Sequence, residues 1–177
     1  MVRRIVTIDT IDGKSFALSD QILDTPLIDP ARPGFKRQRV WLTQSTPATI
    51  DHIEDVDAKS HMLKPPKGGS MFHFYTFPPD KSWISTITAQ QVRSYYQALG
   101  LLQASLYQDG VKHPYYQKVK SLDLCVVLKG EITLILDKTE VHLKKNDSIV
   151  QRGTAHAWSN RSDEECIIAI SSHDAKE

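Results

Sequence analysis

The chain has 177 residues, of which 40% are hydrophobic and 24% are charged, which is typical of a globular protein rather than a disordered one. A chain of this length can bury one sizeable core. Its formal net charge of +1 gives no electrostatic case for nucleic acid or an anionic membrane as a partner. No apolar run approaches the roughly 20 residues that a membrane helix needs. The N-terminus also lacks the apolar core of a signal peptide, so a cytoplasmic location is expected.

The N-terminal segment is expected to form a β-hairpin. Hydrophobic and polar residues alternate in residues 3–9, and residues 14–20 resemble a second strand. Asp12 and Gly13 between them suit a tight turn, because glycine accepts a positive φ without strain. Residues 24–39 contain three prolines and a glycine and are predicted to be a loop.

The basic run at residues 35–39, at the end of that loop, is expected to form a solvated face or a strand edge. Strands are predicted at residues 40–44 and 71–77, and two prolines stop the second of these. Among the histidines of this half, His73 is expected in the core, whereas His52 and His61 fall in an irregular polar stretch.

One helix is predicted, at residues 89–106. Thr88 and Gln91 form a capping box at its start. Apolar residues then recur at helical spacing, and Gly100 weakens the helix or ends it early. Core packing is the expected role of the apolar stripe, and a lid or a dimer contact is the alternative.

From residue 122 onward, the sequence predicts short strands separated by tight turns. The expected strands are 122–128, 132–136, 140–143, 148–150, 156–159 and 166–170. Regular short strands with frequent turns are typical of a sandwich or a barrel. Cys125 and Cys166 lie in apolar runs of this region and are expected to be buried thiols. With no CxxC pair, the sequence predicts neither a disulfide framework nor a zinc site. His142 alternates with apolar neighbours and is expected to face outward.

Two motifs in this strand-rich region resemble those of the cupin family. The first cupin motif usually reads His-x-His, three or four residues, Glu, six residues, Gly. Here Asp123 followed by Gly130 reproduces its second half, with Asp in place of Glu, and Gln117 and Val119 fall near the two histidine positions.

The second cupin motif usually ends Pro-x-Gly-x2-His-x3-Asn. This chain matches it at Gly153, His156 and Asn160, with Gln151 in place of the proline. The resemblance implies an all-β fold, a cupin (RmlC-like) jelly-roll β-barrel with an N-terminal β extension and one helix. Residues 1–110 would be the extension packing on the barrel and residues 111–177 the conserved barrel core, in one structural domain. Cupins commonly pair through N-terminal strands, so a homodimer is expected.

Two of the motif positions that usually bind a metal carry other residues in this chain. Metal-binding cupins use three histidines and a carboxylate, whereas this chain keeps His156 and Asp123. Val119 cannot bind a metal, and Gln117 offers only a neutral oxygen. The site is therefore expected to work without a cofactor. The alternative is a divalent transition metal (Fe, Mn, Ni or Zn) held by His156, Asp123 and Gln117.

Strand alternation predicts which side chains share a pocket. If Asp123 points inward, so do Gln117, Val119, Ser121, Cys125 and Val127, and also His113 and Tyr115 if the strand extends that far. If His156 points inward, so do Trp158 and Asn160. An acid, an imidazole, an amide and an indole against an apolar wall suit a small, partly aromatic or polyketide-like ligand.

This pocket suggests a small-molecule enzyme of lyase or isomerase type, performing dehydration, decarboxylation or proton transfer. Asp123 and His156 would form the acid–base pair. The expected substrate-binding residues are His113, Tyr115, Gln117, Arg152 and Trp158. Arg152 would clamp a carboxylate, with a solvated loop arginine as the alternative reading. Two other functions stay open, a metal-dependent oxygenase and a non-catalytic small-molecule-binding barrel.

Overall fold

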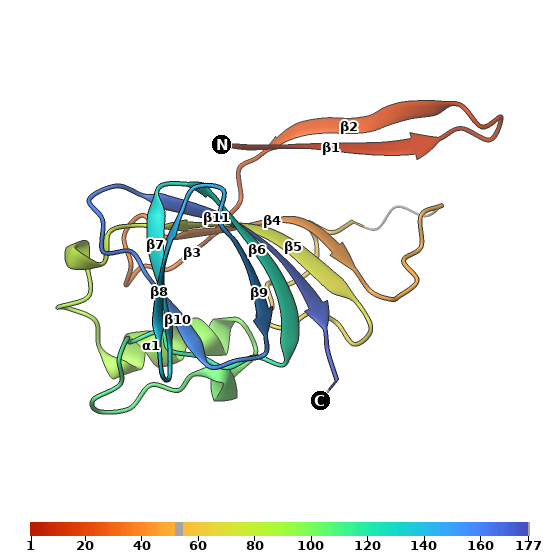
Figure 1. Cartoon of the computed structure of the whole chain (residues 1–177). Helices are drawn as coiled ribbons and strands as arrows, with labels where there is room; N and C mark the ends of the chain where they lie inside the picture. The colour runs from red at the N-terminus through yellow and green to blue at the C-terminus, as the bar shows by residue number, and fades with distance from the viewer. Residues whose placement is uncertain (52–54, 177) are drawn as a thin grey trace.

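A computed structural model describes residues 1–51 and 55–176 of the chain, and it is built mainly from strands (Figure 1). His52 lies outside the described residues. The all-β fold with one α-helix is confirmed. The strands are β1 (Val2–Asp9), β2 (Ser15–Leu23), β3 (Leu27–Ile28), β4 (Lys36–Thr43), β5 (Ser70–Phe77), β6 (Ser121–Lys129), β7 (Glu131–Leu136), β8 (Glu140–Lys144), β9 (Ser148–Arg152), β10 (His156–Ser159) and β11 (Cys166–Asp174). The helices are α1 (Ala89–Ala98) and the short 3₁₀ turns η1 (Asp80–Ser82) and η2 (Leu102–Ala104). None of the helices in the described part of the chain has the length and apolarity to cross a lipid bilayer.

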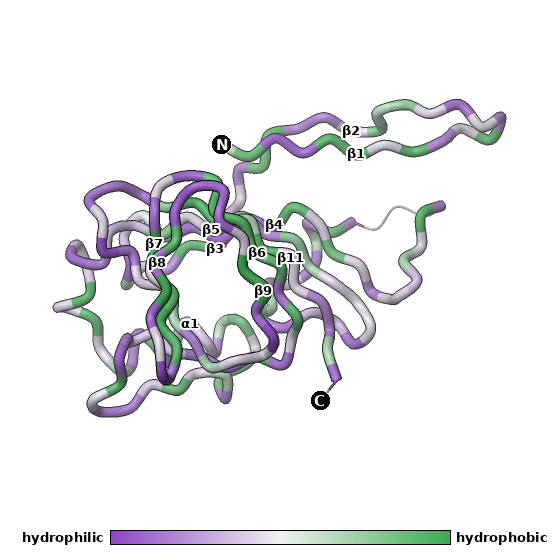
Figure 2. The backbone as a smooth tube through the Cα atoms, in the orientation of Figure 1, coloured by the Kyte–Doolittle hydropathy of each residue, from purple (hydrophilic) through white to green (hydrophobic). Residues whose placement is uncertain are grey.

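Two sheets face each other to make the barrel. One has six strands in the order β3-β4-β5-β11-β6-β9, and the other has three in the order β10-β7-β8. Hydrophobic stretches run along β6 and β7 in Figure 2, and side chains from both sheets meet in one buried cluster. Its members include Val127 and Ile168 from the larger sheet and Ile132 and Leu134 from the smaller one. Cys125 and Cys166 are buried free thiols in this cluster, as expected.

The six-stranded sheet draws strands from both halves of the chain. β5 pairs antiparallel with β11, and β4 pairs with β5. The first 110 residues therefore supply hydrogen-bonded strands to the sheet in addition to the segments that cover it. His73 of β5 is buried in the interior as expected, and His142 of β8 faces outward.

The prediction of a continuous loop over residues 24–39 is wrong, because β3 and the start of β4 lie within it. The basic run at 35–39 was expected to be a solvated face or a strand edge, and this prediction is also wrong, because its Lys36 and Arg37 pair with β3 on one side and β5 on the other. Arg37 is 0% exposed and Arg39 4% exposed. The Arg37 guanidinium donates hydrogen bonds to Tyr75 Oη (2.7 Å) and to the Met62 carbonyl (2.6 Å). These acceptors offset the cost of burying the charge, which the local sequence does not reveal.

The helix ends eight residues earlier than predicted, and the reason lies in its C-terminal cap. The predicted capping box of Thr88 and Gln91 is present at the other end. Gly100 has a φ of 67°, its N–H donates to the Gln97 carbonyl, and the Leu101 N–H donates to the Tyr96 carbonyl. This is a Schellman motif, in which a left-handed glycine ends the helix. The buried face of α1 packs in a second core cluster beside the barrel, which confirms core packing for that face.

The N-terminal hairpin is confirmed, and β1 and β2 form a separate two-stranded sheet that extends away from the barrel (Figure 1). Gly13 has a φ of 76° in the predicted turn. Near its base, Arg4 forms an ion pair with Asp57. Large hydrophobic residues of the hairpin are exposed, namely Ile5, Phe16, Leu18 and Ile22. A two-stranded hairpin is marginally stable by itself in water, so this arm needs further contacts.

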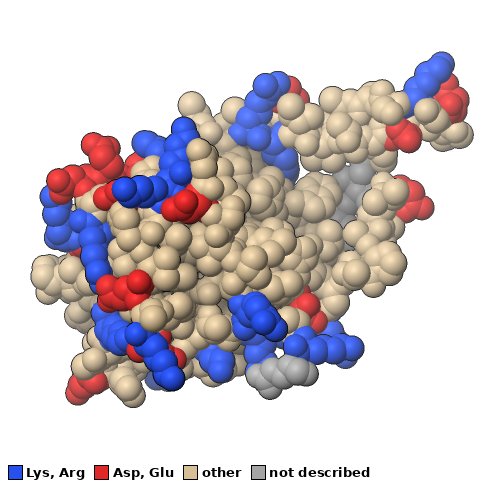
Figure 3. Space-filling model, viewed as in Figure 1, with Lys and Arg blue, Asp and Glu red and all other residues tan. Residues whose placement is uncertain are grey.

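The outer face of β6 is also apolar. Its four outward side chains, Leu122, Leu124, Val126 and Leu128, are exposed, as is Val150 on neighbouring β9. Figure 3 shows a broad region without charged residues across the middle of the face seen in Figure 1. Such a patch on a protein with an unpaired hairpin arm favours self-association, in which the second copy covers both.

We therefore expect the protein to be a homodimer whose interface includes the outer face of β6. Leu124→Glu places a charge in the centre of this patch and is expected to weaken the dimer by at least about tenfold in Kd. Light scattering coupled to size-exclusion chromatography measures the mass. Val141→Glu is the control, because Val141 is similarly exposed on β8 of the other sheet. A monomeric wild-type protein, or a dimer that tolerates Leu124→Glu, would contradict the prediction.

Candidate functional site

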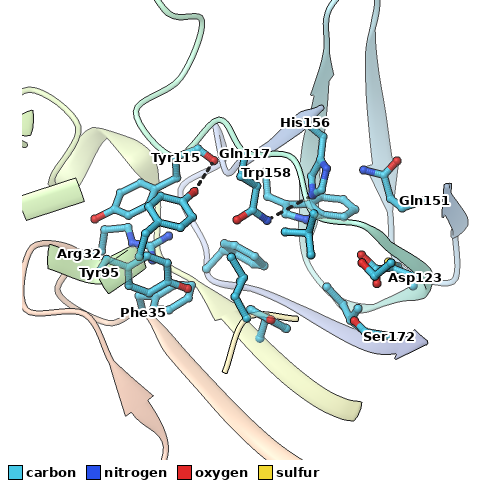
Figure 4. A pocket seen from close by; sticks show the side chains of 18 residues that line it. Arg32, Phe35, Tyr95, Tyr115, Gln117, Asp123, Gln151, His156, Trp158 and Ser172 are labelled. Carbon is cyan, nitrogen blue, oxygen red and sulfur yellow. Dashed lines mark hydrogen bonds between the residues drawn. The ribbon is translucent and has the colours of Figure 1, made fainter. Parts of the chain in front are cut away.

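A cavity of about 50 Å³ lies inside the barrel, next to helix α1. Figure 4 shows the side chains around it. Its walls come from β6, β9, β10 and β11, from β5, from α1 and from the segments before β4 and β6. The lining residues are Arg32, Phe35, Leu63, Tyr75, Phe77, Tyr95, Tyr96, Tyr115, Gln117, Val119, Ser121, Asp123, Cys125, Gln151, His156, Trp158, Ile170 and Ser172.

The alternation predicted from the sequence places one set of residues correctly. Gln117, Val119, Ser121, Asp123 and Cys125 all line the cavity. Two backbone hydrogen bonds hold Gln117, the first of these residues, against β10. The Gln117 N–H donates to the His156 carbonyl (2.8 Å), and the His156 N–H donates to the Gln117 carbonyl (2.9 Å). The two cupin-like motifs are thus joined directly at the cavity.

Asp123 provides the carboxylate of the site. Its Oδ1 atom is buried and has no hydrogen-bond partner among the described residues. Leaving a buried acceptor unpaired costs about 1–3 kcal/mol, and more if it is charged. Burial, with a smaller contribution from the Asp123 charge, raises the pKa of the neighbouring Cys125 thiol far above its usual range. Cys125 is therefore a neutral wall of the cavity and not a thiolate nucleophile.

His156 provides the imidazole and is 5% exposed. Its Nδ1 lies 2.9 Å from the Thr154 carbonyl oxygen, which can only accept, so Nδ1 carries a proton. Burial lowers the pKa of His156, although the Thr154 carbonyl and Asp123 oppose this shift. The ring is therefore neutral near pH 7, and Nε2 has a lone pair that can accept a hydrogen bond or a proton.

The Nε2 lone pair is only loosely occupied. The side-chain Nε2 of Gln117 donates to it over 3.5 Å, at the long limit for a hydrogen bond. Figure 4 shows Gln117 between His156 and the aromatic side of the cavity. A substrate can displace so weak a contact at little cost.

Two other expected residues also reach the cavity. Trp158 forms part of its wall, with its ring 6.0 Å from that of His156 and nearly perpendicular to it. Tyr115 lies on the opposite side, and its hydroxyl donates to Asp29 Oδ2 (2.6 Å). Asn160 was expected on the same face as His156 but lies outside the cavity. Its side-chain amide donates to the carbonyls of Phe77 and Glu164 and holds a loop.

His113 lies outside the cavity as well. The chain before β6 turns at residues 113–116 and does not continue the strand, so the alternation does not reach back this far. His113 is buried against Trp83, with ring centroids 5.7 Å apart, and its Nε2 lies 3.6 Å from Asp80 Oδ2. It belongs to the packing beneath the barrel.

Arg152 does not line the cavity either. It is exposed at the end of β9, where alternation turns it outward and turns its neighbour Gln151 inward. Arg152 borders a separate surface hollow with Lys118 and Lys120. Of the two roles considered for Arg152 from the sequence, this position agrees with a solvated arginine and not with a clamp inside the cavity.

Several cavity residues were not identified from the sequence. Gln151 and Ser172 lie opposite Asp123 on the two neighbouring strands, β9 and β11. The alternation of side chains along one strand does not identify them. The pairing of β6 with its two neighbours does, because residues opposite Asp123 point to the same face of the sheet. Arg32, Tyr75 and Tyr95 come from distant segments and carry no local signal of a site.

The donor set does not fit a transition metal. In residues 1–51 and 55–176, no group of three or more His, Cys, Asp or Glu side chains is placed to hold an ion. One imidazole nitrogen, one carboxylate and neutral amides fall short of the two-histidine, one-carboxylate triad of non-haem Fe(II) oxygenases. Val119, at a histidine position of the motif, is instead packed among aromatic residues.

Two fungal proteins are similar to a short stretch of the chain. Over a stretch of 46 residues, the chain is 54% identical to the phomopsin biosynthesis cluster proteins C′ and D of Diaporthe leptostromiformis. This stretch is 25% of this chain and spans about a quarter of the length of each relative (24%).

Solved structures resemble the chain only distantly. A cupin 2 conserved barrel protein from Salinispora arenicola aligns with a TM-score of 0.43 at 12% identity, covering 88% of this chain and 92% of that one. The Schizosaccharomyces pombe Cnp3 cupin domain aligns with a TM-score of 0.45 at 9% identity, covering 97% and 87%.

The cupin domain family model matches residues 108–171, the segment that contains both motifs and strands β6 to β10. The match agrees with the two-sheet barrel and with the inward side chains of the motifs. This chain therefore carries a cupin domain.

Proposed function

We propose that the protein is a small-molecule enzyme of lyase or isomerase type, in which Asp123 and His156 transfer protons. One observation carries the proposal. A carboxylate oxygen without a partner and an imidazole nitrogen whose lone pair accepts only a 3.5 Å hydrogen bond both line the same buried cavity. A carboxylate and a neutral imidazole are the groups that most often exchange protons with a bound ligand, which supports the proposal.

In this mechanism, His156 Nε2 accepts a proton from a carbon next to a substrate carbonyl. The imidazolium that forms is stabilised by Asp123, whose charge raises the pKa of His156. Returning the proton to another carbon gives isomerisation, and delivering it to a leaving hydroxyl gives dehydration. The Nε2 amide hydrogens of Gln117 are free to bond the substrate oxygen once the contact to His156 is displaced.

The cavity limits the substrate. A volume of about 50 Å³ is smaller than the roughly 150 Å³ cavity that holds a benzene ring, so a ligand of more than a few heavy atoms enters only if side chains such as Gln117 move aside. Its wall combines Trp158 and several tyrosine and phenylalanine rings with polar side chains such as Gln117 and Gln151, and we propose that it takes a small, flat compound with both apolar and polar parts, possible members being small aromatic or polyketide-like ones. The relatives named for phomopsin biosynthesis support a biosynthetic role.

The reaction type is tested by hydrogen exchange. Small enolisable 2-oxo acids and ketones are incubated with the protein in D₂O, and ¹H NMR follows loss of the C–H signal beside the carbonyl. Asp123→Asn and His156→Gln are each expected to slow exchange by about 10²–10⁴-fold. The matched controls are Asp109→Asn and His142→Gln, both at exposed positions. Wild-type exchange in the Asp123→Asn, His156→Gln double variant would refute the proposal, and ligand binding without exchange would support a binding barrel.

The pKa of His156 gives a second test. Because burial lowers it, the base form persists below pH 6.5, and activity is lost only as the pH falls through this lowered pKa. Asp123 raises the same pKa, so Asp123→Asn should lower it further. Titration of the His156 ring signals by NMR measures both values. A pKa at or above 6.5 in the wild-type protein would contradict the prediction.

Metal dependence is tested on protein purified without a chelator. The weak donor set predicts less than stoichiometric iron, manganese, nickel or zinc after dialysis, measured by elemental analysis. It also predicts that adding back each metal changes the exchange rate by less than about twofold. A stoichiometric metal retained through dialysis would favour the metal-dependent oxygenase.

A further inference from the structure

We propose that Arg32 forms a carboxylate-binding subsite at the aromatic end of the cavity, so that the ligand is a small organic acid. The acid group would bind at Arg32 and the reacting carbon would lie toward Asp123 and His156. The second part of this inference rests on the proposed function, whereas the first part is independent of it.

Arg32 is a buried cation whose Nε atom already has a hydrogen-bond partner. It is 5% exposed, and its Nε donates to Asp29 Oδ2 over 2.8 Å. Asp29 also accepts hydrogen bonds from the Tyr115 hydroxyl and from the Ala31 N–H. The carboxylate of Asp29 is thus held by three donors and fixes the orientation of the guanidinium.

Aromatic rings cover the faces of the guanidinium. Its central carbon lies 3.7 Å from the ring centroid of Phe35, 3.5 Å from that of Tyr115 and 4.6 Å from that of Tyr95. Rings at these distances attract the cation but offer no hydrogen-bond acceptor in its plane. A further partner can therefore approach only at the edge.

That edge is unoccupied. The Nη2 atom of Arg32 is buried and has no hydrogen-bond partner among the described residues. Arg32 lines the cavity that contains Asp123 and His156. A guanidinium always carries its charge and has five N–H donors in a planar fork, which matches the two oxygens of a carboxylate. An unused donor in this position is a site that a ligand acid group would complete.

The chemistry of the subsite favours a carboxylate over a phosphate. Asp29 already balances the Arg32 charge, and the other lining residues at this end are aromatic or apolar. A dianion would need more cationic donors than one guanidinium edge provides, whereas a monoanion needs only the free edge. The small cavity volume argues in the same direction.

The two ends of the cavity lie apart. In Figure 4, Arg32, Phe35, Tyr95 and Tyr115 gather on one side, whereas Asp123, Gln151 and Ser172 lie on the other. Gln117 and His156 lie between them. A ligand whose acid group is held at Arg32 would present its distal carbons to the acid–base pair.

The test uses propionate and its neutral analogue propionamide, which have nearly the same shape, as probes of the whole protein. Titrations are followed by ¹H–¹⁵N NMR, including the Arg32 Nε–H signal. Propionate is expected to bind the wild-type protein at least about tenfold more tightly than propionamide. The largest shifts should fall on Arg32 and on the amides of Phe35 and Tyr115.

Arg32→Gln is expected to remove this preference, so that the two probes bind within about twofold of each other. Arg32→Lys should keep part of it, because the charge remains but the fork is lost. Arg152→Gln is the matched control, since Arg152 is exposed outside the cavity, and should leave the preference unchanged. Circular dichroism checks that each variant is folded.

Two outcomes would overturn the inference. One is equal binding of the probes, or no saturable propionate binding up to about 100 mM, in the wild-type protein. The other is a preference for propionate that survives in folded Arg32→Gln. If Arg32→Gln does not fold, the wild-type comparison and the positions of its shifts decide the question.

The same probes separate this inference from the proposed function. Asp123→Asn should still bind propionate, although it loses hydrogen exchange. Propionate binding that depends on Arg32, without any exchange on the 2-oxo acids, would support the subsite and refute the enzyme. Hydrogen exchange that depends on Asp123 and His156, with no preference for propionate over propionamide, would support the enzyme and refute the subsite.

Discussion

The site depends on the register of strand β6 between its neighbours β9 and β11. Asp123 lies opposite Gln151 on one side and Ser172 on the other, and all three side chains point into the cavity. A slip of one residue would turn Asp123 outward and bring Leu122 or Leu124 into the barrel. The hydrophobic side chains of β6 that pack inside, such as Cys125 and Val127, resist this slip. The same register of β6 therefore both buries its hydrophobic side chains in the core and points the Asp123 carboxylate into the cavity.

The sequence predicted correctly those features that depend on interactions between residues close together in the chain. The hairpin turn at Gly13, the capping box at Thr88 and the alternation from Gln117 to Cys125 all depend on residues close in the chain. The family motifs added the fold and the position of His156. The same reasoning failed at His113, where the chain turns before β6 begins and the assumed alternation has no strand to follow.

The other half of the cavity could not be predicted in this way. Arg32 comes from a proline-rich segment, Tyr75 from β5 and Tyr95 from α1, and only tertiary packing brings them together. The burial of Arg37 has the same origin, since its acceptors are Tyr75 and a carbonyl 25 residues away. A charged residue in a polar sequence context is normally assigned to the surface, and only the folded chain supplies the partners that reverse this assignment.

Val119, which stands at a histidine position of the motif, lines the cavity together with both the acid–base pair and the aromatic residues. Val119 packs with Tyr115, Tyr96 and other hydrophobic residues of the cluster under α1, so this part of the cavity wall is apolar. An apolar wall disfavours the imidazolium, and burial is the main cause of the lowered pKa of His156. A histidine in that position would have offered a second metal ligand and a more polar wall. The valine removes both, leaving Asp123 as the charged group that acts on His156. A valine at this motif position therefore offers no metal ligand and adds an apolar side chain to the cavity wall.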